Sequence, residues 1–278
     1  MHVYTACIVS GDLTVGIAGV GAIGSVVARA LDEGLTGFRL EAVTIRDVQR
    51  RSAVLSELER PVDVVDTHEL ARRCDVIVEC APSTAFTGIV RPAAEAGRII
   101  VTVSAAALIE NLAMVDVARA HGGRIILATG ALLGLDAVRA AAKGVIYSVR
   151  MVTRKPPRAL LGAPYLELNH IDITNLSAPL RLFAGSAREG ARGFPANVNV
   201  AAALALAGIG PDRTELEIWA DPGVSRNTHT IKVDADSVRF EMTIENVPTP
   251  DKPGTGLVTA LSVIAALESL TSTLRVGT

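Results

Sequence analysis

The chain has 278 residues, of which 49% are hydrophobic and 3% aromatic, and its formal net charge at pH 7 is −2. The length suggests about two domains, and Ala, Val, Leu and Ile must fill the core, as is usual for parallel sheets covered by helices. A charge so close to zero argues against nucleic acid or an anionic membrane as partner. No apolar run reaches the ~18 residues of a membrane span.

The three cysteines, Cys7, Cys74 and Cys80, form no CxxC pair and are odd in number. They predict neither a disulfide framework nor a zinc site, and we expect no metal. They are typical of reduced thiols in a cytoplasmic protein. Residues 1–11 lack the basic and apolar regions of a signal peptide, and the sequence leaves open whether residues 1–12 form an extra strand.

A glycine-rich turn near the N-terminus is the most informative segment. An apolar run ends in Gly-x-Gly-x-x-Gly, and a helical pattern follows at once, as in dinucleotide-binding domains. The first glycine permits a tight turn, the second lets the backbone approach a pyrophosphate, and the third lets the helix pack on the strand. The helix N-terminus offers free N–H groups to phosphates. We expect the cofactor to lie against Gly19, Gly21, Ala22, Ile23 and Gly24.

Strand-like and helical patterns alternate through the first half of the chain. Such alternation implies right-handed crossovers and a parallel sheet. We therefore predict an α/β protein whose dinucleotide-binding domain, residues 1–128, is a Rossmann-type, doubly wound parallel sheet. The expected strands are residues 14–18, 38–45, 62–65, 75–80, 98–103 and 124–128, and the expected helices are residues 24–33, 47–57, 68–72, 86–96 and 108–121.

The second half has a different texture, because its strand-like segments alternate apolar and polar residues as in a sheet with one exposed face. We predict a catalytic and dimerisation α+β domain over residues 129–254 with an open mixed sheet. An apolar sheet with one uncovered face predicts burial in a homodimer. The expected strands are residues 145–154, 180–185, 215–220, 228–233 and 238–244, with helices at residues 135–143 and 197–207.

The last helix, residues 256–273, follows three prolines that break the chain. It is apolar on most faces, so it must be buried. We expect residues 255–278 to pack back on the dinucleotide-binding domain.

The residue that reads the ribose 2′-group lies about 20 residues after the glycines. Here that position falls on Ile45, beside Arg46. Arg46 is placed to pair with the 2′-phosphate of NADP, helped by Arg50 or Arg51. Alternatively, Asp47 takes the acidic role and the cofactor is NAD. The sequence predicts NAD or NADP and leaves the choice open.

Polar residues of the second half supply candidates for the chemistry. His229 stands where a loop leads into a strand, so it either transfers protons across a cleft or is a hydrogen-bonded structural histidine. Asn197 and Asn199 precede an apolar helix, where either can cap it or bind an amide or carboxylate. Arg154 and Lys155 end a strand and either bind a carboxylate or lie on the surface.

Three short segments follow expected strands of the first domain. Ligands of open α/β sheets bind beyond the carboxyl ends of strands, although simple turn chemistry is the alternative. The residues expected near the cofactor are Cys80, Ala81, Ser104 and Ala131.

Together these segments resemble the L-aspartate dehydrogenase family, which is similar in its two-domain plan to homoserine dehydrogenase and dihydrodipicolinate reductase. The resemblance runs from about residue 13 to residue 270, and the last three of its segments, in their order and spacing, are the most specific. The segments that carry it are Gly19-Val-Gly-Ala-Ile-Gly24, Glu79-Cys-Ala81, Thr129-Gly-Ala-Leu-Leu-Gly-Leu-Asp136, Thr153-Arg-Lys-Pro-Pro157, Phe194-Pro-Ala-Asn-Val-Asn-Val-Ala-Ala202, Ala220-Asp-Pro222 and Asn227-Thr-His229.

The resemblance implies reversible, NAD(P)-dependent oxidation of L-aspartate to iminosuccinate, which hydrolyses to oxaloacetate and ammonia or feeds NAD biosynthesis. It implies that His229 is the catalytic acid and base, oriented by Asp221 or a nearby carbonyl. It also implies that Ala131 and Asn199 contact the cofactor.

The substrate carboxylates then have three candidate partners, Arg154, Lys155 and Asn197. Two other functions remain open: the same chemistry on another amino or oxo acid, and a regulatory protein that binds NAD(P) without turnover.

Four positions depart from the family pattern. Ala106 stands where the family has Gly, Thr129 where it has Ser, Thr230 where it has Glu, and Gly256 where it has Ser. The added methyl groups of Ala106 and Thr129 are expected to narrow the pocket. The segment that ends at Gly256 also lacks the family's Lys, which removes a contact to a carboxylate or phosphate.

Overall fold

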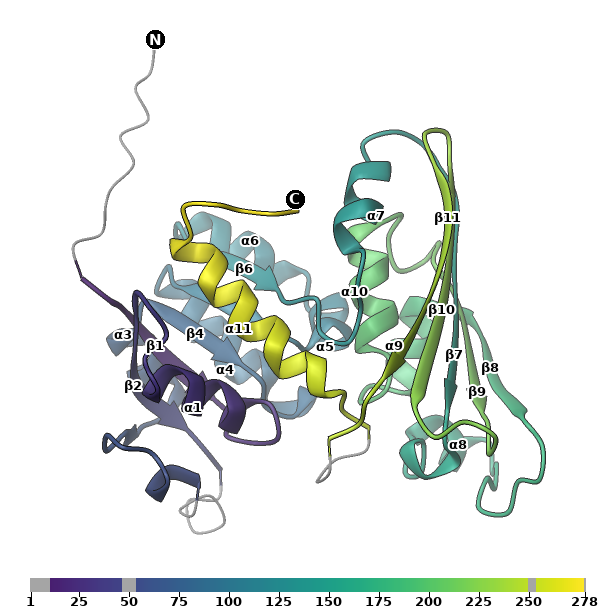
Figure 1. The fold of residues 1–278 in the computed structure, drawn as a ribbon, viewed down its shortest axis with the longest axis horizontal. Coiled ribbons are helices and arrows are strands. Elements are labelled where there is room, and N and C mark those ends of the chain that lie inside the picture. The colour runs from purple at the N-terminus through teal and green to yellow at the C-terminus, as the bar shows by residue number, and fades with distance from the viewer. Residues whose placement is uncertain (1–10, 47–53, 250–253, 278) are drawn as a thin grey trace.

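The computed structural model describes residues 11–46, 54–249 and 254–277, and it shows two layered units side by side (Figure 1). One unit is built on a six-stranded sheet and the other on a five-stranded sheet. Within the described residues, no helix is long and apolar enough to cross a membrane.

The first sheet is parallel throughout, in the order β3-β2-β1-β4-β5-β6. Strand order reverses between β1 and β4, and a crevice at such a point is where open α/β sheets bind ligands. The predicted doubly wound parallel sheet is confirmed. Its strands are β1 (Leu13–Ala18), β2 (Phe38–Thr44), β3 (Asp63–Val64), β4 (Val76–Glu79), β5 (Ile99–Thr102) and β6 (Arg124–Leu127).

Helices cover both faces of this sheet. The C-terminal helix packs beside α1 and against β5, so the end of the chain returns to the first unit (Figure 1). One face carries α1 (Gly24–Asp32) and α11 (Leu257–Thr271), and the other carries α3 (Thr67–Arg73), α4 (Phe86–Glu95), preceded by the single turn η1 (Ser83–Ala85), and α6 (Ala113–Ala120).

The helix expected over residues 108–121 is wrong as a single element. The chain forms α5 (Ala105–Glu110) and then α6, with a turn between them. The Asn111 side chain donates to the carbonyl of Ala107 at 2.8 Å, and such side-chain bonds to the backbone compete with helix propagation. The expected helix at 47–57 and the extra strand at 1–12 fall largely outside the described residues.

The second sheet is mixed, as predicted, in the order β11-β10-β7-β9-β8, with β7 and β9 parallel and the other pairs antiparallel. Helices cover only one of its faces (Figure 1). Its strands are β7 (Ile146–Lys155), β8 (Leu180–Ser186), β9 (Glu215–Ala220), β10 (Asn227–Ala235) and β11 (Arg239–Asn246). The covering helices are α7 (Leu135–Ala141), α9 (Ala187–Gly193) and α10 (Asn199–Ala207), and the β7–β8 connection holds η2 (Pro157–Ala159) and α8 (Pro164–Leu168).

The uncovered face of this sheet is polar, whereas we expected it to be apolar. Alternate residues of each strand point outward, and ion pairs join Arg150 to Glu217 and Lys232 to Glu241. The apolar residues, such as Met151, turn inward and are buried. The homodimer that we inferred from an apolar face stays a prediction.

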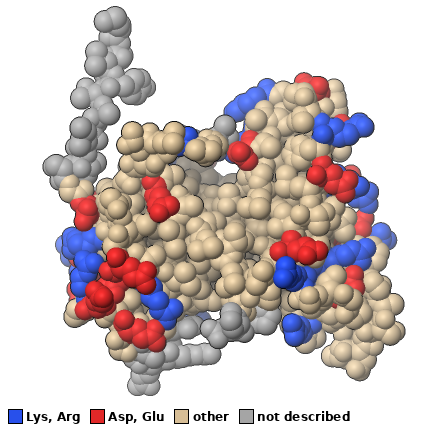
Figure 2. Space-filling view, in the orientation of Figure 1, with Lys and Arg blue, Asp and Glu red and all other residues tan. Residues whose placement is uncertain are grey.

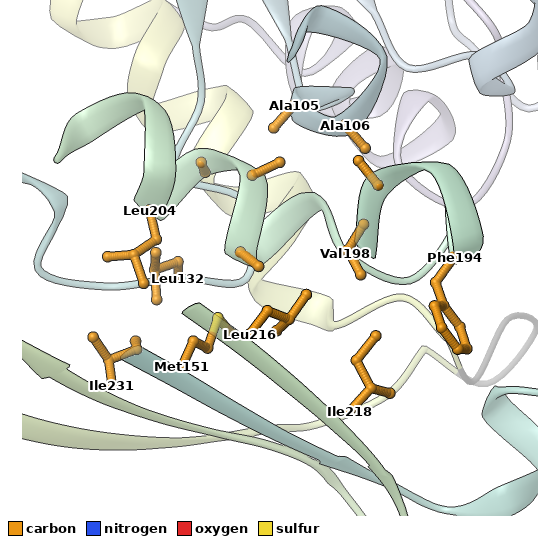
Figure 3. Packing of buried hydrophobic residues seen from close by; sticks show 14 of the residues in the cluster. Ala105, Ala106, Leu132, Met151, Phe194, Val198, Leu204, Leu216, Ile218 and Ile231 are labelled. Carbon is orange, nitrogen blue, oxygen red and sulfur yellow. The ribbon is translucent and has the colours of Figure 1, made fainter. Parts of the chain in front are cut away.

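One apolar core joins the two units. Figure 3 shows Ala105 and Ala106 of α5 packed against α10. Leu204 of α10 and Val198, the residue before this helix, face the strands of the second sheet. The shared packing fixes the first sheet relative to the second. Charged side chains gather at the two outer ends of the molecule, and the middle of the face in Figure 2 is largely free of them.

The glycine turn after β1 leaves no room for a side chain at Gly19 or Gly24. A Cβ on Gly24 would lie 2.0 Å from the carbonyl oxygen of Gly19, and Gly19 has a φ of +97°. We predict that Gly24→Ala lowers the free energy of unfolding by about 3 kcal/mol, the upper end for overpacking. Gly88→Ala is the control, because nothing lies within 4 Å of a Cβ in that helical position. Urea titrations check both, and equal midpoints for Gly24→Ala and the wild type would contradict the prediction.

Candidate active site

Two adjoining cavities open at the carboxyl edge of the first sheet. The larger, about 730 Å³, is lined by the glycine turn and the end of β2. The smaller, about 240 Å³, lies between the two units. An extended ligand can reach from one to the other, since the residues that line both are Ile23, Cys80, Ala81, Pro82 and Thr255.

The larger cavity has the features of a phosphate and nucleotide site. Among the described residues, no side chain caps the N-terminus of α1, and the helix dipole favours an anion there, although the N–H groups of Ser25 and Val26 already donate to the carbonyls of Gly21 and Ile23. Arg46 lines the cavity at the end of β2, and none of the described lining residues is a carboxylate. Asp47, Arg50 and Arg51, the other candidates for the ribose 2′-group, lie outside the described residues.

Hydrogen bonds to neighbouring loops hold the wall between the cavities in place. The fully buried carboxylate of Glu79 accepts from the Thr102 hydroxyl at 2.5 Å and from the Ala81 N–H at 3.1 Å. Burial raises the pKa of the Cys80 thiol, which stays protonated and donates to the Gly19 carbonyl at 3.0 Å. Loops after β1, β4 and β5 are thereby fixed against one another.

The smaller cavity brings His229 and Lys155 together. They lie on neighbouring strands, β10 and β7, and both point to the covered face of the sheet, where they are 2% and 3% exposed. The His229 Nδ1 lies 3.1 Å from the Thr153 hydroxyl, which leaves Nε2 for a ligand. The Lys155 Nζ donates to the backbone oxygen of Asn197 at 3.1 Å and to its Oδ1 at 3.3 Å.

Burial sets the charges in this cavity. Loss of water lowers the pKa of Lys155 to about 8, so at neutral pH it is an ammonium. Burial, and then the charge of Lys155, lower the pKa of His229 to about 3, so the imidazole is neutral. Within the described lining, no carboxylate balances the ammonium. Buried charges are normally paired, so the cavity is prepared for an anionic group.

Arg154 does not join Lys155 in the cavity. Strand alternation turns it to the uncovered face, where it donates to Asp221 at 3.1 Å and lies over the ring of Trp219 at 4.6 Å. The expectation that Asp221 orients His229 is therefore wrong, because the described group that contacts the ring is the Thr153 hydroxyl. Successive residues of a strand point to opposite faces, so the alternation along β7 could have predicted that Arg154 does not share a face with Thr153 and Lys155.

The two asparagines line the cavity instead of capping α10. The helix begins after Val198, with no side-chain cap. Asn197 holds Lys155, and the Asn199 Oδ1 accepts from the Ala106 N–H at 3.0 Å. Ser104 and Ala131 also line the cavity. The asparagine bonds connect α10 to both units at the site.

Sequence reasoning missed three buried polar residues of the cavity, Asn227, Asn246 and Thr259. Asn227 and Asn246 are direct partners in the register of β10 and β11, and the Asn246 amide donates to the Ala131 carbonyl at 3.0 Å. Two asparagines at the meeting ends of a predicted hairpin are the signal that could have found them.

Two of the four departures from the family pattern, Ala106 and Thr230, lie away from the cavity, and the other two, Thr129 and Gly256, line it. Ala106 is buried in the interdomain core and does not line the cavity, so the expected narrowing there is wrong. Thr129 does line it. Thr230 faces outward and contacts the Thr243 hydroxyl at 3.1 Å. Gly256 precedes α11, where a Cβ would lie 3.2 Å from the Asn246 Oδ1.

Comparison with known proteins fits this geometry. Residues 19–128 match the NAD-binding domain of homoserine dehydrogenase, and residues 136–270 match the C-terminal domain of aspartate dehydrogenase. An L-aspartate dehydrogenase of Bradyrhizobium diazoefficiens is 55% identical over 97% of this chain and 95% of its own. The chain belongs to the L-aspartate dehydrogenase family. The predicted family is confirmed, and so is the NAD(P) cofactor class.

Other relatives agree. L-aspartate dehydrogenase 3 of Bordetella bronchiseptica is 51% identical over 96% of this chain and 98% of its own. The crystal structure of an aspartate dehydrogenase from Thermotoga maritima has a TM-score of 0.73 at 23% identity, and the match covers 96% of this chain and 100% of that one. The solved structure supports the fold.

The unpaired ammonium of Lys155 predicts a stability gain on its removal. The folded-state pKa, about 8, is below the ordinary 10.5, so below pH 8 the buried charge opposes folding, and this penalty falls as pH rises from 8 to 10.5. We predict that Lys155→Met raises the free energy of unfolding at pH 7 by about 1 kcal/mol, after loss of the Asn197 bonds, and by less at pH 10.

Denaturant titrations at both pH values check this. The exposed Lys232→Met is the control and changes stability little. A less stable Lys155→Met protein at pH 7 would show that the ammonium is balanced in the free protein.

Proposed function

We propose that the chain catalyses reversible, NAD(P)-dependent oxidation of L-aspartate to iminosuccinate, which hydrolyses to oxaloacetate and ammonia. The observation that carries this proposal is a buried ammonium without a carboxylate partner in the described lining, beside a neutral histidine, in a cavity that adjoins a dinucleotide-type cavity. The named activity of the relatives supports the choice of substrate.

The residues around the glycine turn fit NAD(P). Gly19 and Gly24 let the turn pack tightly, since a Cβ on Gly19 would meet the Ala81 backbone and one on Gly24 the Gly19 carbonyl, and the dipole of α1 favours the pyrophosphate at the helix N-terminus. Asn199 and Ala131 are proposed to hold the nicotinamide end of the cofactor, since both line the smaller cavity. The Oδ1 of Asn199 accepts from the Ala106 N–H, so its Nδ2 is the group proposed to donate to the cofactor. When bound, NAD(P) accepts a hydride from the substrate Cα.

The residues of the second unit hold and deprotonate the substrate in this proposal. Lys155 binds a carboxylate, and Asn197 fixes the position of the Lys155 ammonium. His229 accepts a proton at Nε2 from the substrate ammonium, or later from the attacking water, while Thr153 holds the ring. The two units supply rate mainly by keeping Cα close to the hydride acceptor.

Two alternatives remain, the same reversible chemistry on a different amino or oxo acid and NAD(P) binding without turnover. The first shares the carboxylate site on Lys155, so a panel of amino acids separates it from L-aspartate. The second does not explain why a buried histidine faces the cavity. Homodimerisation and a cytoplasmic location also stay proposals, and light scattering tests the first.

Removal of the imidazole should abolish the reaction. We predict that His229→Ala lowers kcat with L-aspartate by about 10²- to 10⁴-fold, the usual effect of a general base, with the affinity for NAD unchanged. Formation of NADH or NADPH at alkaline pH is the measurement. His121→Ala, which removes an exposed histidine of the first unit, is the control. Absence of turnover in the wild type, or full activity in His229→Ala, would refute the proposal.

Arg46 should decide how well NADP binds. It lines the larger cavity at the end of β2, where an arginine can pair with the 2′-phosphate. We predict that Arg46→Ala raises the Kd of NADP about tenfold, as loss of a charge-assisted contact does, and leaves the Kd of NAD within about twofold. Arg39→Ala, near the opposite end of β2, is the control. An unchanged ratio of the two Kd values would exclude this role.

A further inference from the structure

We propose that the charge of the substrate switches His229 on: the Lys155 ammonium keeps the imidazole a weak base until a substrate carboxylate neutralises that ammonium. The inference rests on the proposed function, because it concerns the same cavity. It adds that Lys155 controls proton transfer as well as binding.

The register of the second sheet places the two groups side by side. His229 of β10 pairs directly with Thr153 of β7, and Lys155 follows two residues later on the same face, about 7 Å along the strand. Both residues are at least 97% buried and line one cavity of about 240 Å³. In such a medium a charge acts on its neighbour more strongly than in water.

The neighbouring elements supply no compensating negative charge from their described residues. On β10 and β11 the groups beside His229 are the amides Asn227 and Asn246, and on α11 the group is the Thr259 hydroxyl. On the first unit, Cys80 is a protonated thiol.

Two carboxylates lie near the cavity but are already engaged. Glu79 accepts from Thr102 and from the Ala81 N–H. Asp221 pairs with Arg154 on the far face of the sheet. Among the described residues, the hydrogen-bond partners of the Lys155 ammonium are therefore the two oxygen atoms of Asn197.

The consequence for His229 is a ligand-dependent basicity. Burial and the Lys155 charge both oppose an imidazolium in the free protein. A carboxylate on Lys155 cancels the second effect and adds an attraction of its own. The imidazole then becomes a base when the substrate that must lose a proton is bound, and it stays neutral without one.

A titration by NMR tests the proposal without turnover. The full-length protein, with its histidines labelled and NAD added, is titrated from about pH 2 to pH 8 with and without succinate, a dicarboxylate that has no amine to oxidise. We expect succinate to raise the pKa of His229 from about 3 to about 5 or higher. Succinamide, which has the same length and no charge, should leave it unchanged.

Lys155→Met is the decisive variant, with Lys232→Met on the outer face as its matched control. In Lys155→Met the succinate effect should disappear, whereas Lys232→Met should behave as the wild type. Succinate that leaves the His229 titration unchanged in the wild type overturns the proposal, and so does an equal rise in Lys155→Met.

Kinetics provide a second readout. A lysine that only anchors the substrate would, on removal, raise KM and leave kcat nearly unchanged. We expect Lys155→Met also to raise the pKa of the base in the kcat/KM profile, which reports the free enzyme, towards that in the kcat profile, because no ammonium then weakens His229 as a base. Failure of L-aspartate turnover alongside an intact succinate effect would refute the proposed substrate and leave the coupling standing, so the two failures are distinguishable.

Discussion

The packing of α5 against α10 is the contact on which the site depends. Both helices present alanines there, and small side chains let two helices approach closely. Because α10 is apolar on all sides, it is covered by α5 on one side and by the sheet on the other. The contact brings the carboxyl ends of β4 and β5 opposite the inward face of β7 and β10. Without it, the dinucleotide cavity and the histidine would lie on separate surfaces.

The same packing creates the electrostatics of the cavity. Lys155 and His229 are dry because helices cover their face of the sheet, and dryness lowers the pKa of both. A lysine on the opposite face, such as Lys232, is exposed and pairs with Glu241. A lysine ammonium therefore forms a surface ion pair on one side of the sheet, whereas on the other side it forms a buried site for an anionic group.

Local sequence predicted those features that depend on the backbone or on periodicity. The glycine turn was readable because only glycine fits where a Cβ would meet a carbonyl oxygen at 2.0 Å. The parallel sheet was predicted from alternating patterns and the helix α11 from its apolar sequence. The expected burial of α11 holds for one side only, since Leu257 and Leu261 are exposed. The break at Asn111 was missed because it depends on one side-chain bond, and the short helix α9 was missed because its core-facing residues are few.

The sequence by itself determined the Rossmann unit, the mixed sheet, the family and the candidate histidine, since motifs and strand periods are written locally. Only the tertiary structure decided that Lys155 shares a cavity with His229 while Arg154 does not, and that Thr153 instead of Asp221 holds the imidazole. The tertiary structure also places Ala106 in the core and Thr230 on the outer face of the second sheet. These outcomes depend on which face of a strand is covered, and burial of a face is a property of the whole fold.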